Sequence, residues 1–253
     1  MTAHALDDTA ALLGRSLRHV VRSPDTIITT TVMPIGFMLL FVYVFGGSID
    51  TGTRPYVDYL LPGILLITVA SGVSYTSYRL FLDLQGGIVE RLRSLPIARS
   101  SVLWAHVLTS LVANAVSVTV VLSVALLLGF RSGAGVLAWL AVAGVLALFT
   151  LALTWDAVVA GLAARSVDGA AAFSYPIMFL PFVSSAFVLT DTMPAPVRAF
   201  AEHQPVTSIV ETVRRLLEGQ PVGDQLATAI AWCLGVLVLA YAAATAVYHR
   251  RFC

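Results

Sequence analysis

The stretch SSVLWAHVLTSLVANAVSVTVVLSVALLLGF, residues 100–130, contains no Asp, Glu, Lys or Arg. It exceeds the roughly 20 apolar residues that a helix needs to cross about 30 Å of hydrocarbon. Uncharged windows of similar length recur at residues 26–49, 59–78, 132–155, 169–190 and 225–248. They lack the alternation of a barrel strand, so only helices can satisfy their backbone groups in lipid. The sequence therefore predicts an all-α, polytopic membrane protein with six transmembrane helices.

Composition supports this class, because 58% of the 253 residues are hydrophobic and only 11% are charged. A soluble domain has about 25% charged residues. We expect one membrane domain over residues 1–253. Its predicted transmembrane helices are residues 26–47, 57–79, 101–128, 135–163, 169–190 and 224–248.

The arginines indicate the orientation of the six predicted spans. Ten fall on the side of both termini: Arg15, Arg18, Arg22, Arg79, Arg91, Arg93, Arg99, Arg165, Arg250 and Arg251. Five fall on the other side: Arg54, Arg131, Arg198, Arg214 and Arg215. By the positive-inside rule, both termini are expected in the cytoplasm of a bacterial cell, with the chain in its inner (plasma) membrane.

Two segments outside the spans have helical patterns. In residues 5–23, apolar side chains recur every three or four positions opposite Arg15, Arg18 and Arg22, which predicts an amphipathic interfacial helix. A soluble helix against a partner remains the alternative. Residues 194–219 predict two short extracellular re-entrant helices, with Glu211 and Arg215 pairing at i,i+4.

Signals for cofactors are weak. The chain has no lysine, so a P-loop is impossible, and its five histidines lack metal-site spacing. We therefore expect no cofactor bound by this chain, no nucleic-acid partner and no enzymatic activity of its own. ATP and magnesium, where used, would be bound by another subunit, and a membrane-embedded enzyme is disfavoured because catalytic side chains do not cluster.

Polar residues within the spans are candidates for a transport path, because a buried charge in lipid is costly. Asp156 is the clearest case, and Asn114 is a second. The alternative is purely structural: a carboxyl bonded to a neighbour such as Thr154, and an amide that joins helices.

The segment LQGGIVERLRSLPIARS, residues 84–100, is the longest strongly charged stretch between two spans. Gly86 and Gly87 are expected to end the preceding helix, and Pro96 to end a short helix parallel to the membrane over residues 84–96. Composition alone would favour a plain topology anchor.

The order of these residues resembles the type 2 ATP-binding-cassette (ABC) exporter permeases, in particular the daunorubicin-resistance-like branch. The family pattern G-x-x-E-R-L-R-S-L-P-I-x-R is matched from Gly87 to Arg99, and DYLLPGILL (58–66) and residues 180–219 are further matches. Trp155–Asp156 departs from the family, where an uncharged residue is expected.

The resemblance implies a permease subunit of a drug, antibiotic or lipid exporter. It would work with two copies of an ABC ATPase subunit and with a second, identical or related, permease. The implied ATPase-coupling residues are Gly87, Ile88, Glu90, Arg91, Leu92, Arg93, Ser94, Leu95 and Pro96. The candidate substrate path comprises Asp156, Asn114, Phe182 and Phe187. An ion- or proton-coupled carrier and a polysaccharide or glycolipid export permease remain alternatives.

Overall fold

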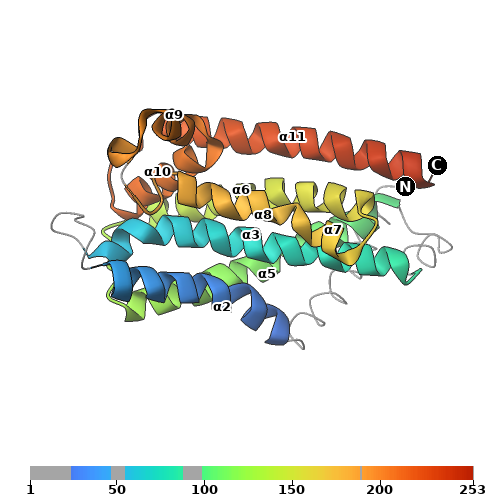
Figure 1. Cartoon of the computed structure of the whole chain (residues 1–253), viewed down its shortest axis with the longest axis horizontal. Helices are drawn as coiled ribbons and strands as arrows, with labels where there is room; N and C mark the ends of the chain where they lie inside the picture. The colour runs from blue at the N-terminus through green and yellow to red at the C-terminus, as the bar shows by residue number, and fades with distance from the viewer. Residues whose placement is uncertain (1–23, 47–54, 88–98, 189, 253) are drawn as a thin grey trace.

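The computed structural model describes residues 24–46, 55–87, 99–188 and 190–252, and every regular element within them is a helix. The prediction of an all-α chain is therefore confirmed for this part. Four helices are long and apolar enough to cross a membrane: α3 (Tyr56–Gln85), α5 (Arg99–Leu127), α6 (Val136–Ala163) and α11 (Gln225–Phe252). They run back and forth along one common axis (Figure 1).

Of the predicted first and fifth spans, the first is helical over about the expected length, whereas the fifth is a shorter helical segment than the sequence suggested. The first comprises α2 (Pro24–Leu40) followed by a π-helical turn, η1 (Phe41–Phe45). The fifth is divided into α7 (Val167–Ala172), α8 (Ser174–Phe179) and the 3₁₀-helix η2 (Leu180–Val183). The helix stops at Ser184, which is extended with φ −135° and ψ −175°.

Prolines explain part of this shortening. Pro176 and Pro181 cannot donate a backbone hydrogen bond to the preceding turn, so the helix is weakened on both sides of Phe179. The segment Val167–Val183 spans about 25 Å at the helical rise of 1.5 Å per residue, which is less than the full hydrocarbon thickness.

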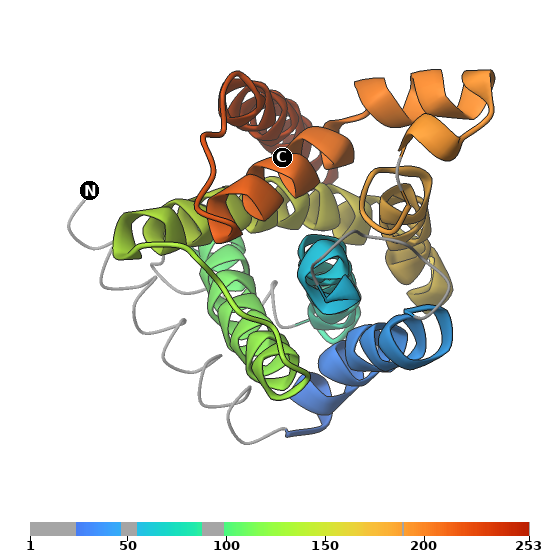
Figure 2. The ribbon, with the colours of Figure 1, turned by 90° about the vertical axis from the view of Figure 1, so that its left-hand side faces the viewer.

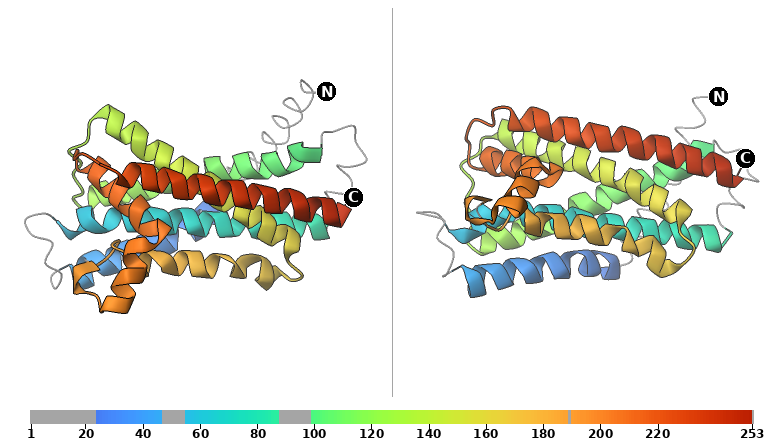
Figure 3. Two further views of the ribbon diagram at one scale, coloured as in Figure 1. Left: turned by 90° about the horizontal axis from the view of Figure 1, so that it is seen from above. Right: turned by 45° about the horizontal axis from the view of Figure 1, so that its top comes forward.

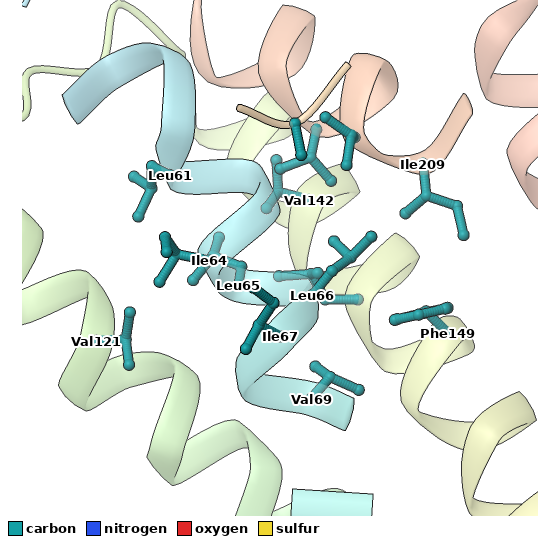
Figure 4. Packing of buried hydrophobic residues seen from close by; sticks show 14 of the residues in the cluster. Leu61, Ile64, Leu65, Leu66, Ile67, Val69, Val121, Val142, Phe149 and Ile209 are labelled. Atoms are coloured by element: carbon teal, nitrogen blue, oxygen red, sulfur yellow. The ribbon is translucent and has the colours of Figure 1, made fainter. Parts of the chain in front are cut away.

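Helix α3 lies in the middle of the bundle, surrounded by α2, α5, α6 and α7–α8 (Figure 2). Its most apolar window is 78% buried inside the protein, against 17% for α11. Leu61, Ile64, Leu65 and Ile67 project from it on all sides into the neighbouring helices (Figure 4). A helix that is apolar all round is expected in such a central position.

Two short helices lie together at one end of the bundle, which we call the α9–α10 end (Figure 1). The helix α9 spans Ala195–His203 and α10 spans Pro205–Leu217, after the 3₁₀ turn η3 (Thr190–Thr192). The predicted apolar face of α10 is buried, including Ile209, Val210 and Val213.

One predicted pairing on α10 is wrong. Glu211 forms its ion pair with Arg214 at i,i+3, not with Arg215. Arg214 faces the protein interior, so the carboxylate turns toward this buried side of the helix rather than toward the exposed one.

The predicted amphipathic helix at residues 5–23 lies outside the described residues. So does the predicted coupling helix from Ile88 onward. Their expected structures stay predictions.

Candidate functional site

A buried arginine organises the α9–α10 end of the bundle. The Arg214 guanidinium donates from Nη2 to the backbone oxygens of Ser185 (2.7 Å) and Tyr59 (3.1 Å). It also lies 3.9 Å from the centroid of the Tyr59 ring. Its side chain is only 8% exposed and is paired with Glu211. Buried cations are stable only with such partners.

Of the carbonyls that Arg214 binds, that of Tyr59 belongs to α3, and that of Ser185 belongs to the irregular segment 184–188, where the shortened fifth helical segment stops. Two tyrosines of α3 bond the same segment, from Tyr56 Oη to the Phe187 oxygen (3.0 Å) and from Tyr59 Oη to the Ser185 oxygen (2.9 Å). Because the helix does not continue past Val183, the carbonyls of this segment lack helical partners. Side chains of α3 and α10 donate hydrogen bonds to them instead.

Four phenylalanines pack beside this segment and join α2–η1 to it. Phe41 stacks on Phe187 with ring centroids 4.7 Å apart, and Phe182 stacks on Phe187 at 5.0 Å. Phe37 meets Phe182 edge-on at 5.5 Å. The predicted path residues Phe182 and Phe187 therefore lie together in an aromatic cluster at the α9–α10 end of the bundle.

A second group of polar side chains lies deeper in the bundle, where α3, α5 and α6 meet. The Thr76 hydroxyl donates to Ser110 Oγ (2.9 Å), and the Ser110 and Thr154 hydroxyls are hydrogen-bonded at 3.2 Å. Asn114 Nδ2 donates to the Ser110 backbone oxygen at 3.0 Å. These bonds link three helices through neutral groups, as is common inside membrane bundles.

Asn114 of α5 packs against Gly72 of α3. Its Oδ1 atom is buried and has no hydrogen-bond partner among the described residues. A Cβ atom at Gly72 would clash with this oxygen, so a larger residue there would require the Asn114 side chain to move. The predicted path residue Asn114 thus packs against the central helix in the deepest part of the bundle.

Asp156 lies on α6 beside this polar group but does not join it. Thr154, the neighbour suggested as a partner, donates instead to the Thr150 backbone oxygen at 2.6 Å. Within the described part of the chain, Asp156 makes no hydrogen bond and no ion pair, and it is half-buried. The flanking Trp155 is fully packed between Trp104 of α5 and Tyr241 of α11.

The opposite end of the bundle carries the charged segment. Helix α3 stops at Gln85, the Gly86 N–H bonds the Leu82 oxygen at 2.8 Å, and Gly87 has a positive φ of 67°. This is the helix end that the glycine pair predicts. Asp83 and His106, 3.3 Å apart, join α3 to α5 just inside this end. Of the nine predicted coupling residues, Gly87 alone lies within the described residues.

The predicted site residues therefore occupy separate places: Phe182 and Phe187 at the α9–α10 end, Asn114 and Asp156 farther along the bundle, and Gly87 at the opposite end (Figures 1 and 3). Sequence reasoning missed Arg214, Tyr56 and Tyr59. Arg214 could be noticed in the sequence as an arginine beside the apolar stripe of α10. Its partner carbonyls are distant in sequence, so the contacts could not be predicted.

Comparison with known proteins adds a family to this arrangement. Residues 8–217 match the model of the ABC-2 type transporter family. The chain is 28% identical over 247 residues to the daunorubicin resistance ABC transporter permease protein DrrB1 of Streptomyces coeruleorubidus, covering 97% of this chain and 84% of that protein. It is 26% identical over 253 residues to a Mycobacterium tuberculosis protein named "Probable doxorubicin resistance ABC transporter permease protein DrrC", covering 98% of this chain and 89% of the relative.

Proposed function

This chain belongs to the ABC-2 type transporter family, and on that premise we propose that it is the membrane subunit of an exporter of amphiphilic drugs. The relatives are named as permeases of daunorubicin and doxorubicin resistance, and the chain covers most of their length. Antibiotics and lipids are further amphiphiles that the same apolar bundle would accept.

The energy for transport comes from a partner. The chain has no lysine for a P-loop, and the described residues contain no group of three or more His, Cys, Asp or Glu that could hold a metal ion. We propose that two ABC ATPase subunits bind ATP and magnesium, and that two permease copies, identical or related, form the pathway. ATP can shift the permease between conformations only as far as the ATPase states bind those conformations differently.

The orientation follows from charge. Helix α11 ends at the end of the bundle opposite α9–α10, whereas α2 begins partway along the bundle (Figure 1). The end opposite α9–α10 carries Arg79, Arg165 and Arg250. Most of the remaining arginines are predicted from the sequence to lie on the same side. We propose that it faces the cytoplasm of a bacterial cell, with six crossings of the inner membrane and α9–α10 on the outer side.

The coupling element is the segment that follows Gly87. Helix α3 runs rigidly from the α9–α10 end to Gln85, and the segment is joined covalently to it. Because α3 lies at the centre of the bundle, a force applied to residues 88–96 reaches every helix that packs on it. The position of this segment, at the end of the central helix, is the observation that carries the proposal.

A double substitution of charged residues in this segment tests the coupling. We expect Glu90→Ala combined with Arg91→Glu to leave the protein inserted but to weaken both ATPase association and efflux. The matched control is Glu202→Ala with Arg198→Glu, which alters an exposed ion pair on α9 at the other end of the bundle. Unchanged ATPase pull-down and normal efflux in the Glu90/Arg91 variant would remove the assignment.

The substrate path is proposed to run past Asp156 and Asn114 toward Phe182 and Phe187. Since Asp156 has no partner within the described residues, its carboxylate is available to a cationic group of a substrate. Asp156→Asn should lower the transport rate of cationic amphiphiles several-fold and leave thermal stability unchanged, whereas Asn114→Ala should lower stability. Equal effects of Asp156→Asn on cationic and neutral substrates would argue against a charge contact.

The unpartnered Asp156 also favours the second candidate function, an ion- or proton-coupled carrier. That function needs no ATPase, so an ATPase gene beside the gene for this chain separates the two. Polysaccharide or glycolipid export is the remaining variant of the first function, and it is separated by measuring ATPase stimulation with a panel of drugs and lipids.

A further inference from the structure

A groove of about 230 Å³ opens between α5 and α6, and its lining includes Asn114 of the proposed path. The two helices cross at an angle rather than lying parallel, as the two views in Figure 3 show. The lining residues recur at three- and four-residue steps on both helices: Leu111, Asn114, Ala115, Val118, Thr119 and Leu122 on α5, and Trp139, Val142, Ala143, Leu146, Ala147 and Thr150 on α6. The groove is therefore a slot between two helix faces.

The hydroxyl and amide donors in this slot form their hydrogen bonds within the protein. Thr119 donates to the Ala115 oxygen (2.8 Å) and Thr150 to the Leu146 oxygen (2.7 Å), each on its own helix. The Asn114 amide donates to Ser110, and its free oxygen faces Gly72 rather than the groove. Apart from the Trp139 indole, the donors of the lining are thus bonded within the protein, and the mostly apolar lining selects an apolar chain over an ion.

The dimensions suit one acyl chain. From Leu111 to Leu122 the groove follows α5 for about 16 Å, close to half of the roughly 30 Å hydrocarbon thickness. Trp139 lies in the first turn of α6, at the α9–α10 end of the groove, where an indole ring is expected at the headgroup level.

A cation lies where the headgroup would be. Leu126 continues the α5 stripe beyond Leu122, and Arg131 reaches back over it, with Nη1 donating to the Leu126 oxygen (3.3 Å) and the Phe130 oxygen (3.0 Å). The exposed Arg131 forms no ion pair with any described residue, and its Nε–Nη2 edge donates to none of them. That edge of a guanidinium binds a phosphate with two parallel hydrogen bonds.

We propose that the α5–α6 groove binds an anionic phospholipid of the leaflet on the α9–α10 side, with one acyl chain in the slot and the phosphate on Arg131. The positive charge disfavours a cationic amphiphile, so the ligand of this groove differs from the cationic substrate proposed to contact Asp156. Its ligand is a lipid that stays with the protein rather than a transported molecule.

Native mass spectrometry of the full chain in detergent tests the site, using phosphatidylglycerol and phosphatidylcholine with identical acyl chains. We expect the protein to retain one phosphatidylglycerol at roughly tenfold lower lipid concentration than phosphatidylcholine, since charge-assisted bonds to phosphate are involved. Arg131→Gln should abolish this preference, and Ala143→Phe, which fills the slot, should remove the tight adduct of either lipid.

The matched controls are Arg198→Gln, an arginine of α9, and Ala231→Phe, an exposed alanine of α11 outside the groove. Both should bind phosphatidylglycerol as the unaltered chain does. Ala147→Phe is a second filling variant, in case Ala143→Phe does not fold. Equal retention of the two lipids by the unaltered chain, or undiminished phosphatidylglycerol binding in Arg131→Gln and the filled variants, would overturn the proposal.

Discussion

Helices α3 and α11 are both long and apolar, yet the protein uses them differently. The apolar window of α3 is 78% buried, while that of α11 is 17% buried and exposes large side chains such as Trp232, Val238 and Leu239. Polar contacts join α3 to α5, α7 and α10, and glycines allow its close packing against α5 and α6. The comparison teaches that hydropathy alone identifies a membrane helix, whereas its place in the bundle is set by a few polar and small residues.

The largest expected effect comes from the arginine that binds α3. Arg214→Met should lower the free energy of unfolding by about 3 kcal/mol or more, because it strands Glu211 and the carbonyls of segment 184–188. Arg215→Met, the next residue on α10, is the control and should change little. The measurement is thermal or denaturant unfolding in detergent. Equal effects at the two positions would contradict the stabilising role of the Arg214 contacts.

A smaller effect on the free energy of unfolding is expected when a glycine of α3 or of α11 is replaced by alanine, and its sign should differ between the two helices. A Cβ at Gly63 of α3 would lie 2.6 Å from the Ala186 Cβ, whereas Gly235 of α11 has nothing within 4 Å. Gly63→Ala should destabilise by about 1–3 kcal/mol through overpacking. Gly235→Ala should be neutral or stabilise by up to about 1 kcal/mol through helix propensity. Loss of stability in both variants would erase the contrast.

The smallest effect is expected from a buried hydroxyl. Thr76→Val keeps the shape of the side chain but removes its bond to Ser110, at a cost of about 0.6 kcal/mol. Thr245→Val on α11 removes only a bond to its own helix, to the Ala242 oxygen, and should be silent. Additive loss in Thr76→Val and Ser110→Ala, tested as a double-mutant cycle, would mean that the two hydroxyls do not interact.

Much of the fold was accessible from the sequence. The four long helices lie at four of the predicted spans, although α3 continues to Gln85, beyond its predicted end at residue 79. The family was also identified, because its motif is local and ordered. Both the spans and the motif are patterns of consecutive residues, so they can be recognised without knowledge of distant contacts.

What could not be predicted depends on contacts between distant residues. The chain after the fifth segment, which ends at Val183, is bonded by Arg214, some thirty residues later in the sequence. The sequence pattern predicts Arg215 as the ion-pair partner of Glu211, whereas the structure pairs Glu211 with Arg214. The packing around α3 includes Gly63 against Ala186 of segment 184–188 and Gly72 against Asn114 of α5. No local pattern reveals such pairs, and the coupling residues from Ile88 to Pro96 remain predictions.

The central claim is that this chain is a permease driven by a separate ATPase, and reconstitution tests it most directly. Efflux of a fluorescent amphiphile is measured in proteoliposomes that contain the chain alone, the chain with its ATPase, and both with ATP. The account predicts transport only in the third case, without any need for an ion gradient. Transport by the chain alone, driven by a proton or sodium gradient, would contradict it.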